Sequence, residues 1–259
     1  MKTTGKFFFI ALCLIFSLQA YAGDKSSFLK KQFTTNSGYK LNYRILYPEN
    51  YNPSQKYPVI LFLHGAGERG ADNEAQLVHG GDMFAAYANQ VKYPAFIIAP
   101  QCPEDSQWAP YKRPIEGYGR IFPTNAPISK PLGAVKELVD EYIAKGMIDT
   151  KQIHVTGLSM GGMGTFDLLC RYPNFFATAT PICGAVNIDR VANYRGKTAI
   201  RLYHGDADKS VDVKYSQEAY EALKKAGANV IYKEYPGVAH NSWDNAFAEP
   251  DYLSWMFNK

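Results

Sequence analysis

Short apolar segments recur along the chain, separated by longer segments in which polar and apolar residues are mixed. Residues 58–65, 95–100, 152–157, 178–184, 198–205 and 229–237 form six of them. Most are apolar throughout, which is typical of strands buried on both faces of a sheet. Three segments between them, 131–146, 164–172 and 215–227, have helical spacing. This alternation predicts an α/β fold with a mostly parallel central sheet and helices on both faces.

The segment before the first of these runs has a different pattern. Residues 28–48 alternate apolar and polar positions around the turn sequence Asn36-Ser37-Gly38, which predicts an N-terminal antiparallel hairpin with one face exposed to water. The chain has 259 residues, of which 46% are hydrophobic, and no repeat or low-complexity linker divides it. We therefore expect a single domain with one large core.

The first 22 residues have the features of a secretory signal peptide. Lys2 and Lys6 precede an apolar run, and Ala20-Tyr21-Ala22 matches a cleavage site of small residues. The run is short for a membrane span, and Leu12 is bulky where a lipid-attachment site before Cys13 would need a small residue. We predict a signal peptide over 1–22, a catalytic domain over 23–259, export to the periplasm or the outside of the cell, and no stable membrane anchor.

Charge and cysteine content exclude several classes of function. The formal charge of +4 becomes +2 without Lys2 and Lys6, and this near neutrality argues against a nucleic-acid partner. Cys102, Cys170 and Cys183 remain, too few for a disulfide scaffold, and we expect buried free thiols at the last two. Cysteines and histidines show no metal-ligand spacing. We predict neither a metal nor a cofactor, and nothing implies a protein partner.

The segment "GLSMGGMG" (157–164) lies between a predicted strand and a predicted helix. Gly157, Ser159 and Gly161 match the G-x-S-x-G pattern, in which a sharp turn holds a nucleophilic serine in a strained conformation above the sheet. The following helix directs free backbone N–H groups towards the reacting centre, where an attacked carbonyl develops negative charge. We therefore predict that Ser159 is a catalytic nucleophile.

A serine nucleophile needs a histidine as its base and a carboxylate to orient that histidine. In enzymes with this serine turn the chain order is serine, acid, histidine, and His204 and His240 are the two histidines after Ser159. His204 lies at the end of a predicted strand, where we expect it to shape the turn. His240 comes later in the chain than all the acidic residues in the loop after that strand, so we predict that His240 is the base.

The loop after the strand at 198–205 offers three acids, at positions 206, 208 and 212. Its sequence "HGDADKSVDV" (204–213) resembles the H-G-x-x-D-x-x-V element of the α/β-hydrolase superfamily. The resemblance implies that Asp208 is the third member of the triad and that Asp206 is a turn residue. Asp212 stands where the element usually has proline, a departure that leaves this assignment intact.

The same resemblance extends to "LFLHGAGERG" (61–70), which is similar to the H-G-x-G loop of that superfamily. It implies an oxyanion hole formed by the backbone N–H groups of Met160 and Ala66, with Gly67 as the alternative second donor. We expect His64 to support this loop by hydrogen bonding. The likeness covers nearly all of 23–259 and is strongest to dienelactone hydrolases, the catalytic domain of prolyl oligopeptidases, and acetylxylan and feruloyl esterases.

Three functions are compatible with these features: a carboxylic ester hydrolase, a serine peptidase of the prolyl oligopeptidase type, and a non-catalytic binding protein. A complete set of catalytic positions disfavours the third, and the lack of room for a gating propeller disfavours the second. Residues 185–197 are too few for a large cap domain, and the segment 101–130 is rich in proline and aromatic residues. We therefore predict an esterase for small esters or for short-acyl or feruloyl esters of carbohydrate, with Trp108 and Trp243 binding substrate. The alternative is that Trp108 packs its segment onto the domain and that Trp243 holds the His240 loop in place.

Overall fold

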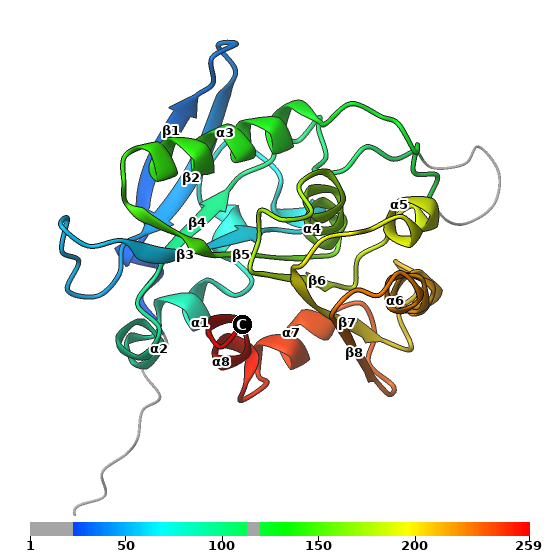
Figure 1. Cartoon of the computed structure of the whole chain (residues 1–259). Coiled ribbons are helices and arrows are strands. Elements are labelled where there is room, and N and C mark those ends of the chain that lie inside the picture. Colours follow the sequence, from blue (N-terminus) through cyan, green and yellow to red (C-terminus); the bar gives the residue numbers. More distant parts are fainter. Residues whose placement is uncertain (1–22, 113–119) are drawn as a thin grey trace, which may run out of the picture.

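The computed structural model describes residues 23–112 and 120–259 of the chain (Figure 1). The predicted signal peptide over 1–22 lies outside the described residues and stays a prediction, as does the domain boundary after it. No helix within the described ranges has both the length and the apolar character needed to cross a membrane.

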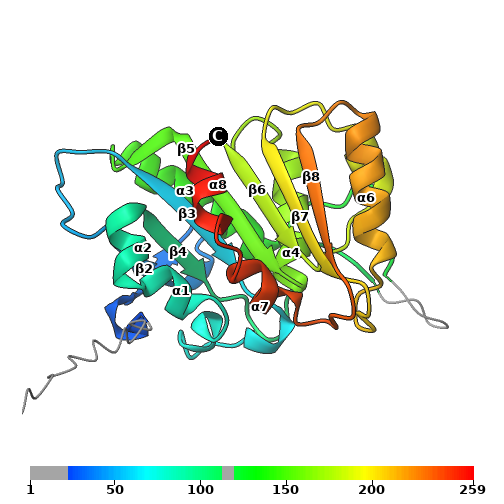
Figure 2. The ribbon, with the colours of Figure 1, turned by 90° about the horizontal axis from the view of Figure 1, so that it is seen from below.

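One sheet of eight strands forms the centre of the molecule (Figures 1 and 2). The strands are β1 (Leu29–Thr34), β2 (Lys40–Leu46), β3 (Tyr57–Leu63), β4 (Phe96–Pro100), β5 (Ile148–Leu158), β6 (Thr178–Ile182), β7 (Ala199–Gly205) and β8 (Val230–Tyr235). Their spatial order is β1-β2-β4-β3-β5-β6-β7-β8. β1 pairs with β2 and β2 with β4 in antiparallel fashion, and all other pairs are parallel. The antiparallel hairpin and the parallel sheet are both confirmed, but the expectation of one wet face on the hairpin is wrong. β1 is exposed at nearly every position because it lies at the edge of the sheet, whereas β2 lies between two strands and is buried at most positions.

Helices cover both faces of this sheet. They are α1 (Gly81–Ala85), α2 (Tyr87–Lys92), α3 (Lys130–Ala144), α4 (Met160–Arg171), α5 (Ile188–Ala192), α6 (Lys214–Lys225), α7 (Ser242–Phe247) and α8 (Tyr252–Phe257), with 3-10 turns η1 (Lys25–Ser27), η2 (Ala66–Glu68) and η3 (Ala75–Leu77). Figure 2 shows α7 and α8 crossing one face, with α3 and α4 behind the strands. Between β6 and β7 the chain forms only the short helix α5, in agreement with the prediction of no large cap domain.

The apolar strands have two buried faces because each face contributes to a separate hydrophobic cluster. In β3, Val59, Leu61 and Leu63 pack into the cluster that includes residues of α3, α4 and α6. The alternate residues Ile60 and Phe62 pack on the other side with residues of α1, α7 and α8. Successive side chains of a strand point to opposite faces, so burial of both faces requires an apolar residue at nearly every position.

Candidate active site

Ser159 occupies the single residue between the end of β5 and the start of α4. Its backbone angles, φ 53° and ψ −113°, lie in a region that residues other than glycine rarely adopt. Two backbone hydrogen bonds hold this conformation: Ser159 N–H donates to the Ile182 carbonyl at 2.9 Å, and the Ser159 carbonyl accepts from Met163 N–H at 3.0 Å. The surrounding strand and helix therefore stabilise a strained turn that presents the serine side chain at the edge of the sheet.

The two flanking glycines permit this turn because other backbone segments pass very close to them. A Cβ atom on Gly161 would lie 1.9 Å from the Leu63 carbonyl oxygen and 2.8 Å from that of His64. A Cβ on Gly157 would lie 2.5 Å from the Gly161 carbonyl oxygen. The two glycines of the G-x-S-x-G pattern are therefore required because the serine turn lies very close to the end of β3 and the loop that follows it.

His240 lies in the loop after β8, just before α7, and connects the serine to a carboxylate. Its Nε2 is 2.9 Å from Ser159 Oγ, and its Nδ1 is 2.7 Å from Asp208 Oδ2. A carboxylate only accepts hydrogen bonds, so Nδ1 carries the proton and Nε2 is free to accept from the serine hydroxyl. The structure therefore brings together the three residues that the sequence proposed as nucleophile, base and acid.

Asp208 is held by donors on both carboxylate oxygens, and its side chain is fully buried. Oδ1 accepts from the N–H groups of Ser210 and Val211 at 2.8 and 2.9 Å. Burial acts to raise the pKa of Asp208, but hydrogen bonds from His204, His240 and Val211 outweigh it and hold the pKa well below the ordinary value of 3.8. The carboxylate therefore stays ionised.

The other two candidate acids point elsewhere. Asp206 Oδ1 accepts from Gly237 N–H at 2.6 Å, so this residue holds the loop after β8 to the loop after β7. Asp212 Oδ1 accepts from Lys214 N–H at 3.0 Å, next to the start of α6. Asp208 is the one of the three whose carboxylate contacts His240.

The loop with the expected second oxyanion donor begins where β3 ends and continues into η2. His64 is buried at its start: Nε2 accepts from Cys102 N–H at 2.9 Å, and Nδ1 is 2.6 Å from the Gly65 carbonyl oxygen. Burial lowers the pKa of His64 to about 4, so this ring is neutral at pH 7. These contacts bear out the expectation that His64 supports the loop. Ala66 is the first residue of η2, and Met160 is the first residue of α4.

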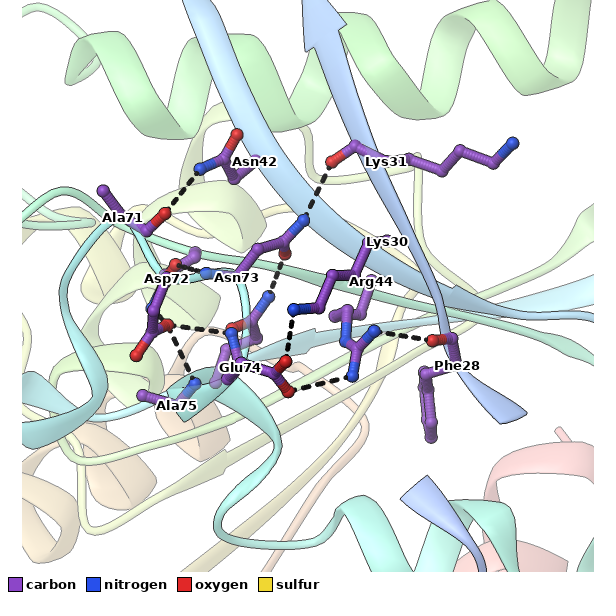
Figure 3. A network of polar contacts seen from close by, with 12 residues as sticks. Phe28, Lys30, Lys31, Asn42, Arg44, Ala71, Asp72, Asn73, Glu74 and Ala75 are labelled. Atoms are coloured by element: carbon purple, nitrogen blue, oxygen red, sulfur yellow. Dashed lines mark hydrogen bonds and ion pairs between the residues drawn. The ribbon is translucent and has the colours of Figure 1, made fainter. Parts of the chain in front are cut away.

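Figure 3 shows how polar contacts fix the continuation of this loop to the first two strands. Asn73 Nδ2 donates to the carbonyl oxygens of Lys31 and Tyr43 at 3.1 and 3.3 Å. Arg44, whose side chain is largely buried, pairs with Glu74 at 3.2 Å and donates to the Phe28 carbonyl at 2.8 Å. The antiparallel strands therefore anchor the segment that leads away from the oxyanion loop.

The expectation that Trp108 binds substrate is wrong. Its side chain is completely buried, and its Nε1–H donates to the His64 carbonyl oxygen at 3.0 Å. The Trp108 ring also contacts the His64 ring edge-on, with centroids 5.2 Å apart. Because this tryptophan packs beneath the loop instead of lining an open cleft, it supports the oxyanion loop from within the core.

Trp243 does lie next to the catalytic candidates. Its ring packs edge-on against His240, with centroids 5.4 Å apart, and also contacts the His79 ring at a tilt, with centroids 5.0 Å apart. The side chain is only partly buried. Its contact with His240 restricts the orientation of the imidazole, and a role in binding substrate stays a prediction.

Sequence reasoning gave His204 only a role in the turn, but this residue also reaches Asp208. His204 Nε2 is 3.1 Å from Asp208 Oδ2, the same oxygen that contacts His240 Nδ1. The sequence did contain a pointer to this contact, because His204 and Asp208 are the first and last residues of the H-G-x-x-D part of the element. The spacing alone, however, does not say that the two side chains meet.

The three cysteines of the described part are free, and Cys170 is partly exposed whereas Cys102 and Cys183 are buried. Within the described ranges, Cys183, Asp208 and His240 place possible metal-ligand atoms within 4.8 Å of one another. Metals bind the thiolate, and burial raises the pKa of the Cys183 thiol to about 12. Asp208 and His240 are already hydrogen-bonded to each other, so this group is a poor metal site.

The parallel sheet with antiparallel leading strands, and a serine on the sharp turn between β5 and α4, define an α/β-hydrolase. Residues 50–250 match the phospholipase/carboxylesterase family, and the chain belongs to that family. It is a hydrolase of the carboxylesterase type.

Several individual proteins are similar to this chain. The carboxylesterase SOBER1 of Arabidopsis thaliana is 29% identical over 70% of this chain and 82% of that protein. An uncharacterized secreted protein of Arthroderma benhamiae is 24% identical over 79% of this chain and 23% of that protein. A thermostable esterase of known structure has a TM-score of 0.77 and 32% identity, covering 90% of this chain and 63% of the other. A ferulic acid esterase from Anaeromyces mucronatus shares the fold, with a TM-score of 0.64 and 16% identity over 92% and 94% of the two chains.

Proposed function

We propose that this protein is an exported serine esterase that works through an acyl-enzyme intermediate. Ser159 Oγ attacks the ester carbonyl while His240 Nε2 takes its proton, and His240 then donates that proton to the departing alcohol. Water repeats the cycle on the acyl-enzyme and releases the acid. The observation that carries this proposal is the unbroken hydrogen-bond chain from Ser159 through His240 to Asp208, at 2.9 and 2.7 Å.

In this mechanism the negative oxygen of the tetrahedral intermediate binds the N–H groups of Met160 and Ala66. Met160 N–H opens helix α4, where the helix dipole also favours negative charge. One such donor contributes about 3 to 4 kcal/mol to stabilising the transition state. The buried carboxylate of Asp208 stabilises the imidazolium that forms on His240 during each proton transfer.

For the substrate we propose short-acyl or feruloyl esters of carbohydrate. A cavity of about 630 Å³ adjoins the loop that carries Asp208, and it is lined by Arg120, Asp208, Lys209, Ser210, Asp212, Lys214, Tyr215 and Glu218. Such a polar lining suits a hydroxyl-rich alcohol better than a long acyl chain. The short connection through α5 leaves no large apolar cap to shelter such a chain. Export is supported by the predicted signal peptide and by the secreted relative.

A hydrolysis panel on the purified protein tests this proposal. The panel contains nitrophenyl acetate, butyrate and octanoate, methyl ferulate, acetylated xylan and an X-Pro amide. We expect kcat/KM to fall steeply from acetate to octanoate, with clear activity on the ferulate or on the xylan. A preference for octanoate would contradict the proposed substrate class. Cleavage of the X-Pro amide faster than every ester would instead indicate the serine peptidase considered from the sequence.

Matched substitutions test the proposed roles. Ser159→Ala and His240→Ala each lower kcat by about 10³- to 10⁶-fold, and Asp208→Ala by somewhat less, because the three residues act as a unit. Asp206→Ala is the control, since this neighbouring acid contacts Gly237 instead of His240. If Asp206→Ala lowers kcat as much as Asp208→Ala does, with equal thermal stability, the assignment of the acid is wrong.

A further inference from the structure

Two histidines share one carboxylate oxygen of Asp208. His204, near the end of β7, is completely buried. Its Nε2 is 3.1 Å from Asp208 Oδ2 and 2.9 Å from the Val211 carbonyl oxygen, and its Nδ1 is 2.7 Å from Ser216 Oγ. Every nitrogen of this ring therefore has a defined partner.

These partners determine where the proton of His204 lies. Both groups facing Nε2 are acceptors, so Nε2 carries the hydrogen, and Nδ1 accepts from the Ser216 hydroxyl. Asp208 then receives four hydrogen bonds: one each from His204 and His240 at Oδ2, and two from backbone N–H groups at Oδ1. A buried carboxylate with this number of donors has one orientation.

We propose that His204 is a positioning residue for the triad acid. Its Nε2–H fixes the orientation of the Asp208 carboxylate, and because it shares Oδ2 with His240 it also weakens the interaction of that oxygen with the His240 ring. This inference rests on the proposed catalytic role of Asp208. His204 touches neither Ser159 nor the expected place of the substrate, so it acts only through the carboxylate. Its loss should therefore lower the rate of the chemical step and leave substrate affinity unchanged.

The shared oxygen also predicts the direction of a pH effect. Without the His204 hydrogen bond, Asp208 Oδ2 interacts more strongly with the His240 ring and favours its protonated form. The acid limb of the kcat/KM profile, which reports protonation of the base in the free enzyme, then moves to higher pH. The titratable and charged groups around this pair include the Cys183 thiol, directly after β6, and Glu234, which lies opposite His204 in the β7–β8 register. Arg120, Lys209 and Asp212 line the same cavity as Asp208. None of these groups is altered by the substitutions below.

The test compares His204→Gln with His204→Asn. The amide nitrogen of Gln can reach the position of Nε2 and donate to Asp208, whereas the shorter Asn reaches only the position of Nδ1. With nitrophenyl acetate we expect His204→Asn to lower kcat about 10-fold or more, to change KM less than about twofold and to move the acid limb to higher pH. His204→Gln should retain kcat within about threefold and keep the wild-type limb.

His154→Asn is the matched structural control. His154 on β5 is also completely buried with both nitrogens bonded, to Thr178 and Gln152, but it does not contact the triad. This variant should lower Tm without moving kcat or the acid limb. If both His204 variants behave like His154→Asn, the positioning role is refuted.

A measurement without substitution covers the case in which His204→Asn does not fold. Nitrogen chemical shifts of the histidine rings in the wild-type protein distinguish the two tautomers, and the proposal requires Nε2–H at His204. An Nδ1–H tautomer would overturn it, since that ring cannot donate to Asp208.

Ser159→Ala separates this inference from the proposed function. Activity that survives Ser159→Ala refutes the esterase mechanism, whereas its loss together with an Nδ1–H tautomer refutes only the role of His204.

Discussion

Gly161→Ala tests the close contact between the serine turn and the oxyanion loop. The new methyl group would lie 1.9 Å from the Leu63 carbonyl oxygen, so the two backbones must separate by at least about 1.1 Å before the contact reaches 3.0 Å. Both sides are main chain: one belongs to the end of β3 and the other to the first turn of α4. No side chain can move aside to relieve the overlap.

Two magnitudes follow from this displacement. Overpacking by one methyl group costs about 1 to 3 kcal/mol in an ordinary core, and we expect the upper end or more because the clash involves a strand and a helix. A displacement of about 1 Å between catalytic groups lowers the rate about 100-fold, and the proposed oxyanion donors, the amides of Met160 and Ala66, lie on the two segments that separate. We therefore expect a loss of about 3 kcal/mol in unfolding free energy and of about 100-fold in kcat.

Urea unfolding and nitrophenyl acetate hydrolysis measure these two quantities on the same preparation. Gly67→Ala is the control, because a Cβ at Gly67 meets no other atom within 4 Å, although Gly67 lies in the same loop. We expect this control to change stability by less than about 0.5 kcal/mol. A Gly161→Ala enzyme with wild-type stability and kcat would refute the argument that these two segments must touch.

Two further predictions concern buried titratable groups. Burial lowers the pKa of His64 and of His154 from 6.5 to about 4, so the folded protein binds fewer protons than the unfolded chain between these values. The unfolding free energy should therefore fall as the pH drops from 6.5 to 4, by up to about 3 kcal/mol for each histidine, and a flat urea-unfolding profile in this range would contradict the assignment. Burial also raises the thiol pKa of Cys102 and Cys183 to about 12 and that of Cys170 to about 11, so iodoacetamide at pH 8 should label these residues only after unfolding. Rapid labelling of the folded protein, measured by mass spectrometry, would show that they are accessible thiolates.

Local sequence was sufficient wherever one residue type alone satisfies a physical requirement. Strands buried on both faces must be apolar at nearly every position, so β3, β4, β6, β7 and the second half of β5 could be recognised directly. The start of β5 was missed because residues 149–151 are polar and largely exposed. The serine turn could be recognised because Gly157 and Gly161 leave space that no side chain can occupy. The first turn of α4 was missed for the same reason: glycines at 161, 162 and 164 hide its helical spacing, and the predicted helix began at 164.

The short helices α1, α2, α5, α7 and α8 were not predicted, since segments of five or six residues are too short to show a period. Their stability comes from packing on the sheet, which is a tertiary effect. Trp108 failed as a substrate-binding prediction for a related reason. The sequence of an irregular segment does not show whether an aromatic residue lines a cleft or fills the core. Only the fold shows that the Trp108 N–H reaches the His64 carbonyl.

By itself, the sequence determined an α/β fold with a mostly parallel sheet and the position of the serine turn, because burial and backbone strain restrict the residue types at those positions. The α/β-hydrolase fold and the choice of Asp208 as the acid came from the resemblance to that superfamily. The tertiary structure decided which side chains meet. Asp206, Asp208 and Asp212 are chemically identical in one loop, and only the direction of each side chain separates the partner of His240 from two turn residues. The contact between His204 and Asp208 likewise depends on how the loop folds back on β7 over a few ångströms, a distance that residue spacing does not specify.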